Sequence, residues 1–329
     1  MGLFFSHPPY VPERDIPGLD GRVTVVTGAD SGIGFHTVEQ LAAHGAKVYL
    51  LCITLENAQD AISRIELNLP RLRGTKCLVP VQIDLSSLAS VREAARTILA
   101  EEKRLDILIN NAGRLASDYV QADSGVEMSV AVNHIGPFVL TTMLLPLLKS
   151  TASLPGSDVR IISLTSYAYK LAGPVRFTTL DDLNDPRGAP GARNGWLAKF
   201  RRYGATKLMI ILFIGELQRQ LDAENIPITA MAVHPGEIAT PAAITNTPLV
   251  IRPYIWIAAL SPYQGSFTTL FAATSRRIYE ARDQFKGCYL VPYGEIEKLT
   301  TPQSQDEQLA RTLWETTERV VKTLDGIAG

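Results

Sequence analysis

The sequence has few cysteines and almost no excess charge of either sign, and both absences narrow the class of protein. Its three cysteines, Cys52, Cys77 and Cys288, are odd in number and far apart along the chain. Such spacing fits neither a disulfide framework nor a zinc ribbon, and it favours a reducing compartment. With 32 lysines and arginines against 33 aspartates and glutamates, the formal net charge is -1. A chain so balanced predicts no broad basic surface for nucleic acid or an anionic membrane.

Long apolar runs are also missing. No stretch approaches the roughly 20 apolar residues that a membrane-spanning helix needs. The nearest runs are Phe138–Leu148, which we interpret as a buried helix, and Leu249–Leu260, which Arg252 and Pro253 interrupt and which we interpret as an apolar flap. A secretory signal is not indicated, because the apolar start of the chain is short and lacks a basic segment. We therefore expect a cytoplasmic protein without a transmembrane helix.

The first residues leave two interpretations open. Met1-Gly2-Leu3-Phe4-Phe5-Ser6 matches the N-myristoylation pattern, with Gly2 as the acceptor and peripheral membrane association as the consequence. Patterns this short often occur by chance. We favour an unmodified apolar arm over residues 1–20, packed on the body of the protein, in which Pro8 and Pro9 stop any helix.

The composition that is present is that of a globular protein, with 46% hydrophobic and 20% charged residues. From residue 21 onward, short β-rich runs alternate with segments of helical apolar spacing, which is typical of a doubly wound parallel sheet with helices on both faces. Residues 21–329 are thus expected to form a single α/β (Rossmann) domain of about seven strands. The expected strands are Arg22–Thr27, Lys47–Ile53, Cys77–Asp84, Leu105–Asn110, Val159–Leu164, Ile228–Val233 and Cys288–Val291. The expected helices are Ile33–His44, Leu55–Leu67, Leu88–Glu101, Glu127–Lys149, Tyr203–Leu221 and a last helix with an apolar stripe from Leu309 to Leu324.

Two stretches, at about 168–202 and 241–262, interrupt this alternation and are rich in Gly, Pro and polar residues. They follow strands at their carboxyl ends, where open α/β sheets bind ligands. We interpret both as substrate loops. Trp256, in the second of them, is the aromatic residue expected to contact the substrate.

A glycine-rich turn follows the first expected strand. Thr27-Gly28-Ala29-Asp30-Ser31-Gly32-Ile33-Gly34 joins that strand to a helix. Backbone N–H groups at a helix N-terminus bind a pyrophosphate when no Cβ atoms block the approach. Three glycines alone are a weak signal, but the strand–turn–helix context that the motif requires is present. The sequence therefore predicts dinucleotide binding here.

With this turn, further motifs resemble those of the short-chain dehydrogenase/reductase family. The resemblance covers roughly residues 20–240, in the family's order, and the tail with Gly287–Pro292 and Leu313-Trp314-Glu315 is similar to fungal members near the retinol-dehydrogenase branch. The matching segments are Thr27–Gly34, Asp84-Leu85, Asn110-Asn111-Ala112-Gly113, Asn133, Ser166, the Tyr203-x-x-x-Lys207 pair and His234-Pro235-Gly236. The resemblance implies that the cofactor contacts Gly28, Asp30, Ser31, Gly32, Ile33, Gly34, Thr54, Asp84, Leu85, Asn111, Ala112, Gly113, Tyr203, Lys207, Pro235, Gly236, Ile238 and Thr240.

Tyr203 and Lys207 are four residues apart, so a helix places both side chains on one face. A free tyrosine titrates near 10, and a nearby lysine ammonium would stabilise the phenolate and lower that pKa, which makes proton exchange feasible. The family resemblance implies that Ser166 hydrogen-bonds the substrate oxygen, that Lys207 also holds the nicotinamide ribose, and that Asn133 anchors a water relay to Lys207. The expected catalytic residues are thus Ser166, Tyr203, Lys207 and Asn133, with Ser166 and Tyr203 touching the substrate.

Structural roles remain open for several of these positions. Ser166 could cap a strand end, and Ser163 or Thr165 could replace it if the register is shifted. Asn133 could pin a helix kink, His134 is expected to pack or cap, and the backbone of His234 is expected to matter more than its ring. Arg201 and Arg202 flank Tyr203 and could meet a polar substrate, although a solvated face is favoured. No spacing of Asp, Glu, His or Cys indicates a metal site.

The cofactor motif departs from the family pattern at the end of the second strand. An acidic residue there selects NAD, and a nearby arginine accommodates the 2′-phosphate of NADP. This chain has Cys52 at the acidic position and Ile53 where relatives carry arginine. Because no carboxylate at these positions repels a phosphate, and because Ser31 and Thr54 could donate to it, we favour NADP(H) over NAD(H).

The leading functional hypothesis is an NAD(P)-dependent dehydrogenase/reductase that reduces a ketone or aldehyde, or oxidises the alcohol. The apolar residues of 241–262 favour a small apolar or aromatic substrate, such as a retinoid-, steroid- or polyketide-like carbonyl. A dehydratase, epimerase or cyclase on the same fold, or a non-catalytic NADP(H)-binding module, remains an alternative. A homodimer is also open, with Met209, Ile210 and Phe213 helping to bury its interface; a monomer with these residues partly covered is the other reading.

Overall fold

The computed structural model describes residues 10–237 and 260–328, in which one sheet contains eight strands. These are β1 (Val23–Thr27), β2 (Lys47–Cys52), β3 (Leu78–Gln82), β4 (Ile107–Asn110), β5 (Val159–Leu164), β6 (Ile228–Val233), β7 (Tyr289–Val291) and β8 (Glu295–Ile296). They lie in the order β3-β2-β1-β4-β5-β6-β7-β8. The seven expected strands pair in parallel, and the additional strand, β8, pairs antiparallel with β7. The expected doubly wound fold is therefore confirmed, with one further edge strand.

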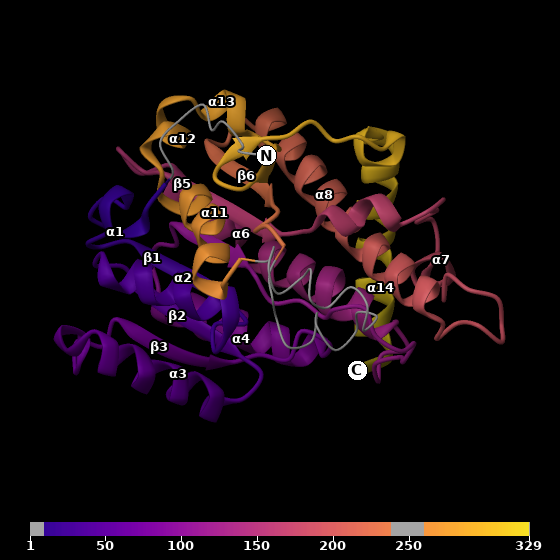
Figure 1. Ribbon diagram of the computed structural model, residues 1–329, viewed down its shortest axis with the longest axis horizontal. Helices are drawn as coiled ribbons and strands as arrows, with labels where there is room; N and C mark the ends of the chain where they lie inside the picture. Colours follow the sequence, from indigo (N-terminus) through magenta and orange to yellow (C-terminus); the bar gives the residue numbers. More distant parts are fainter. Residues whose placement is uncertain (1–9, 238–259, 329) are drawn as a thin grey trace.

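Helices cover both faces of the sheet (Figure 1). Side chains of α2 (Gly32–Ala43), α3 (Leu55–Asn68) and α11 (Pro262–Thr274) pack on one face, and those of α4 (Leu88–Glu101), α6 (Gly136–Ala152) and α8 (Trp196–Ala223) pack on the other. This is why the central strands are apolar at successive positions: Val25 faces one layer and Val26 the other, and both are fully buried. The remaining helices are α1 (Pro12–Asp15), η1 (Pro70–Leu72), α5 (Met128–Val130), η2 (Ala131–Ile135), η3 (Tyr167–Leu171), α7 (Leu180–Leu183), α12 (Arg276–Glu280), α13 (Arg282–Phe285), η4 (Pro302–Gln305) and α14 (Glu307–Ala328).

The expected loop 168–202 is in part helical. It contains most of η3 and all of α7, and α8 begins at Trp196 rather than at Tyr203. The ring of Trp196 lies 4.6 Å from that of Phe200 one turn later, which supports the added turns of helix. The expectation was wrong because the apolar residues of this extension form no buried stripe like that of a core helix: Trp196 and Leu197 are 53% and 51% exposed.

One helical segment, Met128–Ala152, is 25 residues long and apolar enough to cross a membrane, with a mean hydropathy of 1.5 in its most apolar 18-residue window. The run predicted from sequence was much shorter. However, 67% of its most apolar window is buried inside the protein, and residues such as Leu140, Leu144 and Leu148 are fully buried in the core. We therefore describe it as a core helix that packs between the sheet and its neighbours α4 and α14.

The C-terminal helix α14 packs along α8 (Figure 1). The ring of Trp314 stacks on Phe213 with centroids 5.7 Å apart and meets Phe138 of α6 edge-on at 4.9 Å. Met209 and Ile210 are buried in the same chain as well. The three residues proposed for a dimer interface are thus already covered within one chain, which removes the physical reason for assigning them to a contact between subunits.

The described part of the N-terminal arm, residues 10–20, packs on the body as expected. Tyr10, Ile16 and Leu19 are buried, and the Tyr10 hydroxyl hydrogen-bonds the Thr274 hydroxyl at 2.9 Å. One helical turn, α1, begins at Pro12, where proline is compatible with a helix start. The acceptor Gly2 of the myristoylation pattern lies outside the described residues.

Candidate active site

The predicted cofactor and catalytic residues meet at the carboxyl edge of the parallel sheet. The glycine turn follows β1, Thr54 follows β2, Asp84-Leu85 follows β3, Asn111–Gly113 follows β4, Ser166 follows β5 and Pro235-Gly236 follows β6. Tyr203 and Lys207 approach the same edge from α8. The strand order reverses between β1 and β4, and ligands of doubly wound sheets bind at this point.

The glycine turn has the shape that a dinucleotide pyrophosphate requires. Gly28 and Gly32 have φ of +62° and +57°, a region that favours glycine. A Cβ on Gly34 would overlap the carbonyl oxygen of Gly28, whereas a Cβ on Gly32 would meet nothing within 4 Å. The turn is therefore closed toward its own helix and open on the side where a phosphate would approach the N-terminus of α2. These residues fit the dinucleotide that their motif indicates.

Asn111 locks this turn to the end of β4. Its Nδ2 donates to the carbonyl oxygens of Thr27 and Gly28 at 2.8 and 3.1 Å. The Thr27 hydroxyl accepts from the backbone N–H of both Asn111 and Ala112 at 3.0 Å. Thr27 was not among the predicted site residues, although its place directly before the first glycine is the signal that could have identified it. The contribution of Asn111 is thus to shape the cofactor turn.

A negative charge lies near the end of β2, although the residues at the strand end itself are uncharged. Cys52 is buried, and burial, together with the negative charge of the nearby Asp30, raises the pKa of its thiol to about 12. Positions 52 and 53 themselves carry no carboxylate, as expected, but Asp30 brings one to this corner from the glycine turn. Thr54 caps α3 by accepting from the N–H of Asn57 at 3.1 Å, whereas the Ser31 side chain makes no cap bond to the described start of α2.

Ser166, Tyr203 and Lys207 form one cluster. The Ser166 hydroxyl lies close enough to the phenol of Tyr203 to lower the pKa of that phenol, and Lys207 Nζ lies 5.6 Å from the centre of the Tyr203 ring. The buried ammonium of Lys207 donates to the carbonyl oxygen of Leu164 at 2.9 Å. Ser166 also caps η3, accepting from the N–H of Ala168 at 3.2 Å. The expected juxtaposition is thus present, and the alternative role of Ser166 as a cap is present with it.

The pKa values of the cluster differ from the simple expectation. Burial raises the pKa of Tyr203 to about 12, the hydrogen bond from Ser166 opposes that rise, and the charge of Glu237 adds to it. Burial lowers the pKa of Lys207 to about 8. The prediction that lysine brings the tyrosine pKa below its usual value is wrong here, because desolvation outweighs the other effects. At neutral pH, Tyr203 is a phenol and Lys207 an ammonium.

Asn133 lies in the π-helical turn η2, where the helix from Met128 to Ala152 is irregular. Its Nδ2 donates to Thr206 Oγ1 and to the carbonyl oxygen of Arg114, both at 2.9 Å, and its Oδ1 accepts from the Arg114 N–H at 2.6 Å. Thr206 in turn donates to the carbonyl oxygen of Tyr203 at 2.8 Å. Asn133 therefore ties the segment after β4 to the helix that carries Tyr203 and Lys207.

The two alternatives to Ser166 have other partners. The Ser163 hydroxyl accepts from Asn110 Nδ2 at 3.2 Å, and the Thr165 hydroxyl donates to the carbonyl oxygen of Lys207 at 2.8 Å. Both side chains are buried in the sheet and its contact with α8. Ser166 is left as the hydroxyl next to Tyr203.

The histidines have structural surroundings. His134 hydrogen-bonds Thr317 at 2.8 Å between aromatic rings, and burial lowers its pKa to about 3. His234 is buried against Tyr167, with ring centroids 4.2 Å apart, and burial together with Lys207 and Lys170 lowers its pKa to about 4. Both are neutral at pH 7, as packing roles require.

Arg201 is exposed, as expected, but Arg202 is buried rather than solvated. The Arg202 guanidinium donates to the carbonyl oxygens of Ser117, Pro186 and Arg193. It therefore holds the long segment before α8 in place. Arg202 thus neither lies on a solvated face nor contacts a polar substrate, the two roles considered from the sequence.

The remaining predicted residues that the structure describes include Asp84 and Leu85 after β3 and Gly236 after β6. The Asp84 carboxylate accepts from the N–H and hydroxyl of Ser86, and Leu85 is buried against Gly136. Gly236 has φ of +96° and lies against Leu260. Ile238, Thr240, Trp256 and most of the second substrate loop lie outside the described residues. Among residues 10–237 and 260–328, no group of three or more His, Cys, Asp or Glu side chains could hold a metal ion.

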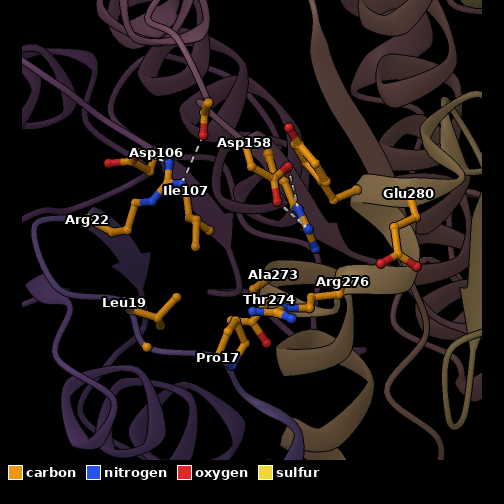
Figure 2. Close-up of a pocket in the computed structure, with 14 residues that line it drawn as sticks. Pro17, Leu19, Arg22, Asp106, Ile107, Asp158, Ala273, Thr274, Arg276 and Glu280 are labelled. Atoms are coloured by element: carbon orange, nitrogen blue, oxygen red, sulfur yellow. Dashed lines mark hydrogen bonds and ion pairs between the residues drawn. The ribbon is translucent and has the colours of Figure 1, made fainter.

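A separate cavity of about 490 Å³ lies at the opposite, amino edge of the sheet. Figure 2 shows Arg22 beside Asp106, with Asp158 across the cavity. Arg22 and Asp106 form an ion pair at 2.7 Å, and Arg160 pairs with Asp158 at 2.5 Å and donates to two carbonyl oxygens of the α11–α12 segment. Because none of the residues that line it belongs to the glycine turn or to the cluster of Ser166, Tyr203 and Lys207, this cavity is not the candidate active site.

Comparison with known proteins agrees with this geometry. The family model "short chain dehydrogenase" matches residues 22–176. The chain is 46% identical over 308 residues to the short chain dehydrogenase/reductase dpchH of Colletotrichum higginsianum, covering 93% of this chain and 76% of that one. The chain belongs to the short-chain dehydrogenase/reductase family. As a member, it is an NAD(P)-dependent oxidoreductase with a Rossmann fold.

Two further proteins are similar to this dehydrogenase/reductase over most of its length. It is 34% identical over 323 residues to human retinol dehydrogenase 14, covering 94% of this chain and 89% of the relative. The crystal structure of an uncharacterized protein from Mycobacterium paratuberculosis is 27% identical, with a TM-score of 0.69 and coverage of 96% of this chain and 98% of the other. The fold thus extends over nearly the whole chain.

Proposed function

We propose that this dehydrogenase/reductase interconverts a ketone or aldehyde with its alcohol, that the substrate is apolar or aromatic, and that NADP(H) is the preferred cofactor. The observation that supports the chemistry is the meeting of Tyr203, Ser166 and a buried Lys207 ammonium beside the glycine turn. A positioned phenol, a second hydroxyl and a fixed positive charge are what proton transfer to a carbonyl oxygen needs.

In the direction of reduction, Tyr203 donates its proton to the carbonyl oxygen as that oxygen gains negative charge. Because burial raises the pKa of Tyr203 to about 12, the phenol holds its proton through neutral pH until the substrate oxygen becomes basic enough to take it. Ser166, whose hydroxyl lies beside the phenol of Tyr203, polarises the same oxygen. Lys207 stabilises the phenolate that remains and returns it to the neutral form by proton transfer.

When bound, the nicotinamide cofactor supplies the hydride for reduction or accepts it in oxidation. The residues that would hold it are those of the turn from Gly28 to Gly34, Thr54, Asp84-Leu85, Asn111–Gly113, Tyr203, Lys207, Pro235, Gly236, Ile238 and Thr240. Asn133 acts as a positioning residue, since its hydrogen bonds link the segment after β4 to Thr206. Its part in a water relay remains a prediction.

The substrate class is supported by the sequence and by one relative. The segment 241–262 carries Leu249, Val250, Ile251, Tyr254 and Trp256, which would line an apolar site. The name of one relative, retinol dehydrogenase 14, refers to an apolar alcohol of this kind. We propose a retinoid-, steroid- or polyketide-like carbonyl, with Trp256 as a direct substrate contact.

A panel of carbonyl compounds, followed by the loss of nicotinamide absorbance, tests this function. We expect turnover of bulky apolar ketones or aldehydes with NADPH, and Trp256→Ala should raise KM by about ten- to a hundredfold, in line with about 1–3 kcal/mol for a large aromatic contact. Cofactor affinity should be unchanged in that variant. Turnover of small polar carbonyls alone would contradict the proposed substrate class.

A further inference from the structure

The adenosine-ribose end of the cofactor site lies where β2 ends, since doubly wound folds read the ribose 2′ position there. In this chain β2 ends in Cys52, which is buried, followed by Ile53, whose side chain is 58% exposed. Neither can pair with a ribose hydroxyl or with a phosphate. The groups that distinguish the two cofactors must therefore come from other elements.

A carboxylate reaches this corner from the glycine turn. Asp30, two residues after Gly28, lies near the Cys52 thiol, and its negative charge adds to the effect of burial in raising the pKa of that thiol. A carboxylate at this position accepts hydrogen bonds from ribose hydroxyls and repels a phosphate.

A guanidinium reaches the same turn from α3. Arg64 Nη2 donates to the carbonyl oxygen of Asp30 at 2.5 Å, and Nε pairs with Asp60 Oδ2 at 2.9 Å. The guanidinium carbon lies 4.5 Å from the centre of the Phe35 ring, one residue after Gly34. These contacts orient the side chain against the turn, although 46% of it is exposed. Within the described part of the chain, Arg64 Nη1 has no hydrogen-bond partner.

We infer that Arg64 and Asp30 form an opposed pair that sets cofactor choice: Arg64 binds the 2′-phosphate of NADP(H), and Asp30 binds the ribose hydroxyls of NAD(H). A planar guanidinium with free N–H groups matches a phosphate, and stacking on Phe35 fixes its orientation. The inference rests on the proposed NADP(H) preference and names the residues behind it. It also means that the enzyme binds both cofactors, with Arg64 outweighing the repulsion from Asp30.

The test is a set of fluorescence titrations of purified protein with NADPH, NADH, adenosine 2′,5′-bisphosphate and 5′-AMP. The variants are Arg64→Gln, Arg64→Lys and Asp30→Asn. Arg71→Gln is the matched control, because the exposed Arg71 also donates to a backbone carbonyl, that of Ala43, at 2.6 Å, but outside the glycine turn. Asp30→Asn keeps the carbonyl oxygen that Arg64 contacts, so it changes the charge and leaves the turn in place.

Arg64→Gln should weaken NADPH and the bisphosphate by about ten- to a hundredfold, the effect of a charge-assisted hydrogen bond, and change NADH and 5′-AMP by less than about twofold. Arg64→Lys keeps the charge and should retain part of the NADPH affinity. Asp30→Asn should weaken NADH by about tenfold and strengthen NADPH. Arg71→Gln should behave as wild type.

Equal weakening of all four ligands by Arg64→Gln would assign Arg64 to the shape of the turn and overturn the inference, as would no effect on NADPH. If Arg64→Gln fails to fold, the same comparison is made with Arg64→Lys and Asp30→Asn. Failure of the proposed function gives a different result, in which the wild-type protein binds neither NADPH nor NADH.

Discussion

At the scale of single residues, desolvation decides the state of the catalytic cluster. Tyr203 and Lys207 both shift toward their neutral forms, the tyrosine to a pKa of about 12 and the lysine to about 8. A one-unit shift corresponds to about 1.4 kcal/mol between the two protonation states, so these shifts matter for the chemistry. The motif alone could not reveal them, because burial depends on helices and loops that lie far away in the sequence.

The lysine pKa predicts a pH profile for carbonyl reduction. Lys207 is charged below its pKa of about 8 and loses its proton above it, whereas Tyr203 remains a phenol throughout. The kcat/KM for the carbonyl substrate should therefore be level from about pH 6 to 7 and fall above about pH 8, approaching tenfold per pH unit. Steady-state kinetics with saturating cofactor measure this. A profile that stays level to pH 10 would show that the charge on Lys207 is not needed.

The roles of Ser166 and Ser163 can be distinguished by substituting each of them. Ser166→Ala should lower kcat by about 10²- to 10³-fold, because a donor to a developing oxyanion is lost, with little change in cofactor affinity. Ser163→Ala removes a hydroxyl that only accepts from Asn110, so it should cost stability rather than rate. Kinetics and NADPH titration of both variants make the comparison. Equal kcat values for the two variants would contradict the assignment of Ser166, rather than Ser163, as the donor to the substrate oxygen.

At the scale of elements, sequence predicts what local pattern determines. The seven parallel strands were predictable from β-branched runs, and the glycine turn from its position between a strand and a helix. The start of α8 at Trp196, the edge strand β8 and helix α11 were missed, because their residues are exposed, few or close to a Gly- and Pro-rich stretch. The roles of Asp30 and Arg202 could not be predicted either, since each depends on a contact between distant segments.

Helix α14 is expected to stabilise the fold through Trp314. Its ring is nearly buried between Phe138 and Phe213, so Trp314→Ala should lower the free energy of unfolding by about 3–5 kcal/mol. Trp196→Ala is the matched control, since that side chain is 53% exposed and should change it by less than about 1 kcal/mol. Urea unfolding with tertiary-structure spectroscopy measures both. Similar losses for the two tryptophans would mean that α14 contributes little.

At the scale of the whole molecule, every proposed catalytic and cofactor residue that the structure describes lies at one edge of the sheet, and the paired charges of the large cavity lie at the other. This separation follows from parallel strands, whose carboxyl ends all meet on one side. The identity of the substrate could not be predicted in the same way, because it depends on loop geometry rather than on the fold.

The central claim is that Tyr203 transfers the proton, and Tyr203→Phe tests it most directly. The substitution removes one oxygen and keeps the ring, so the variant should fold and bind NADPH as the wild type does. Its kcat for carbonyl reduction should fall by about 10²- to 10⁴-fold, the usual contribution of one positioned acid. A folded, NADPH-binding Tyr203→Phe protein with wild-type turnover would contradict the account.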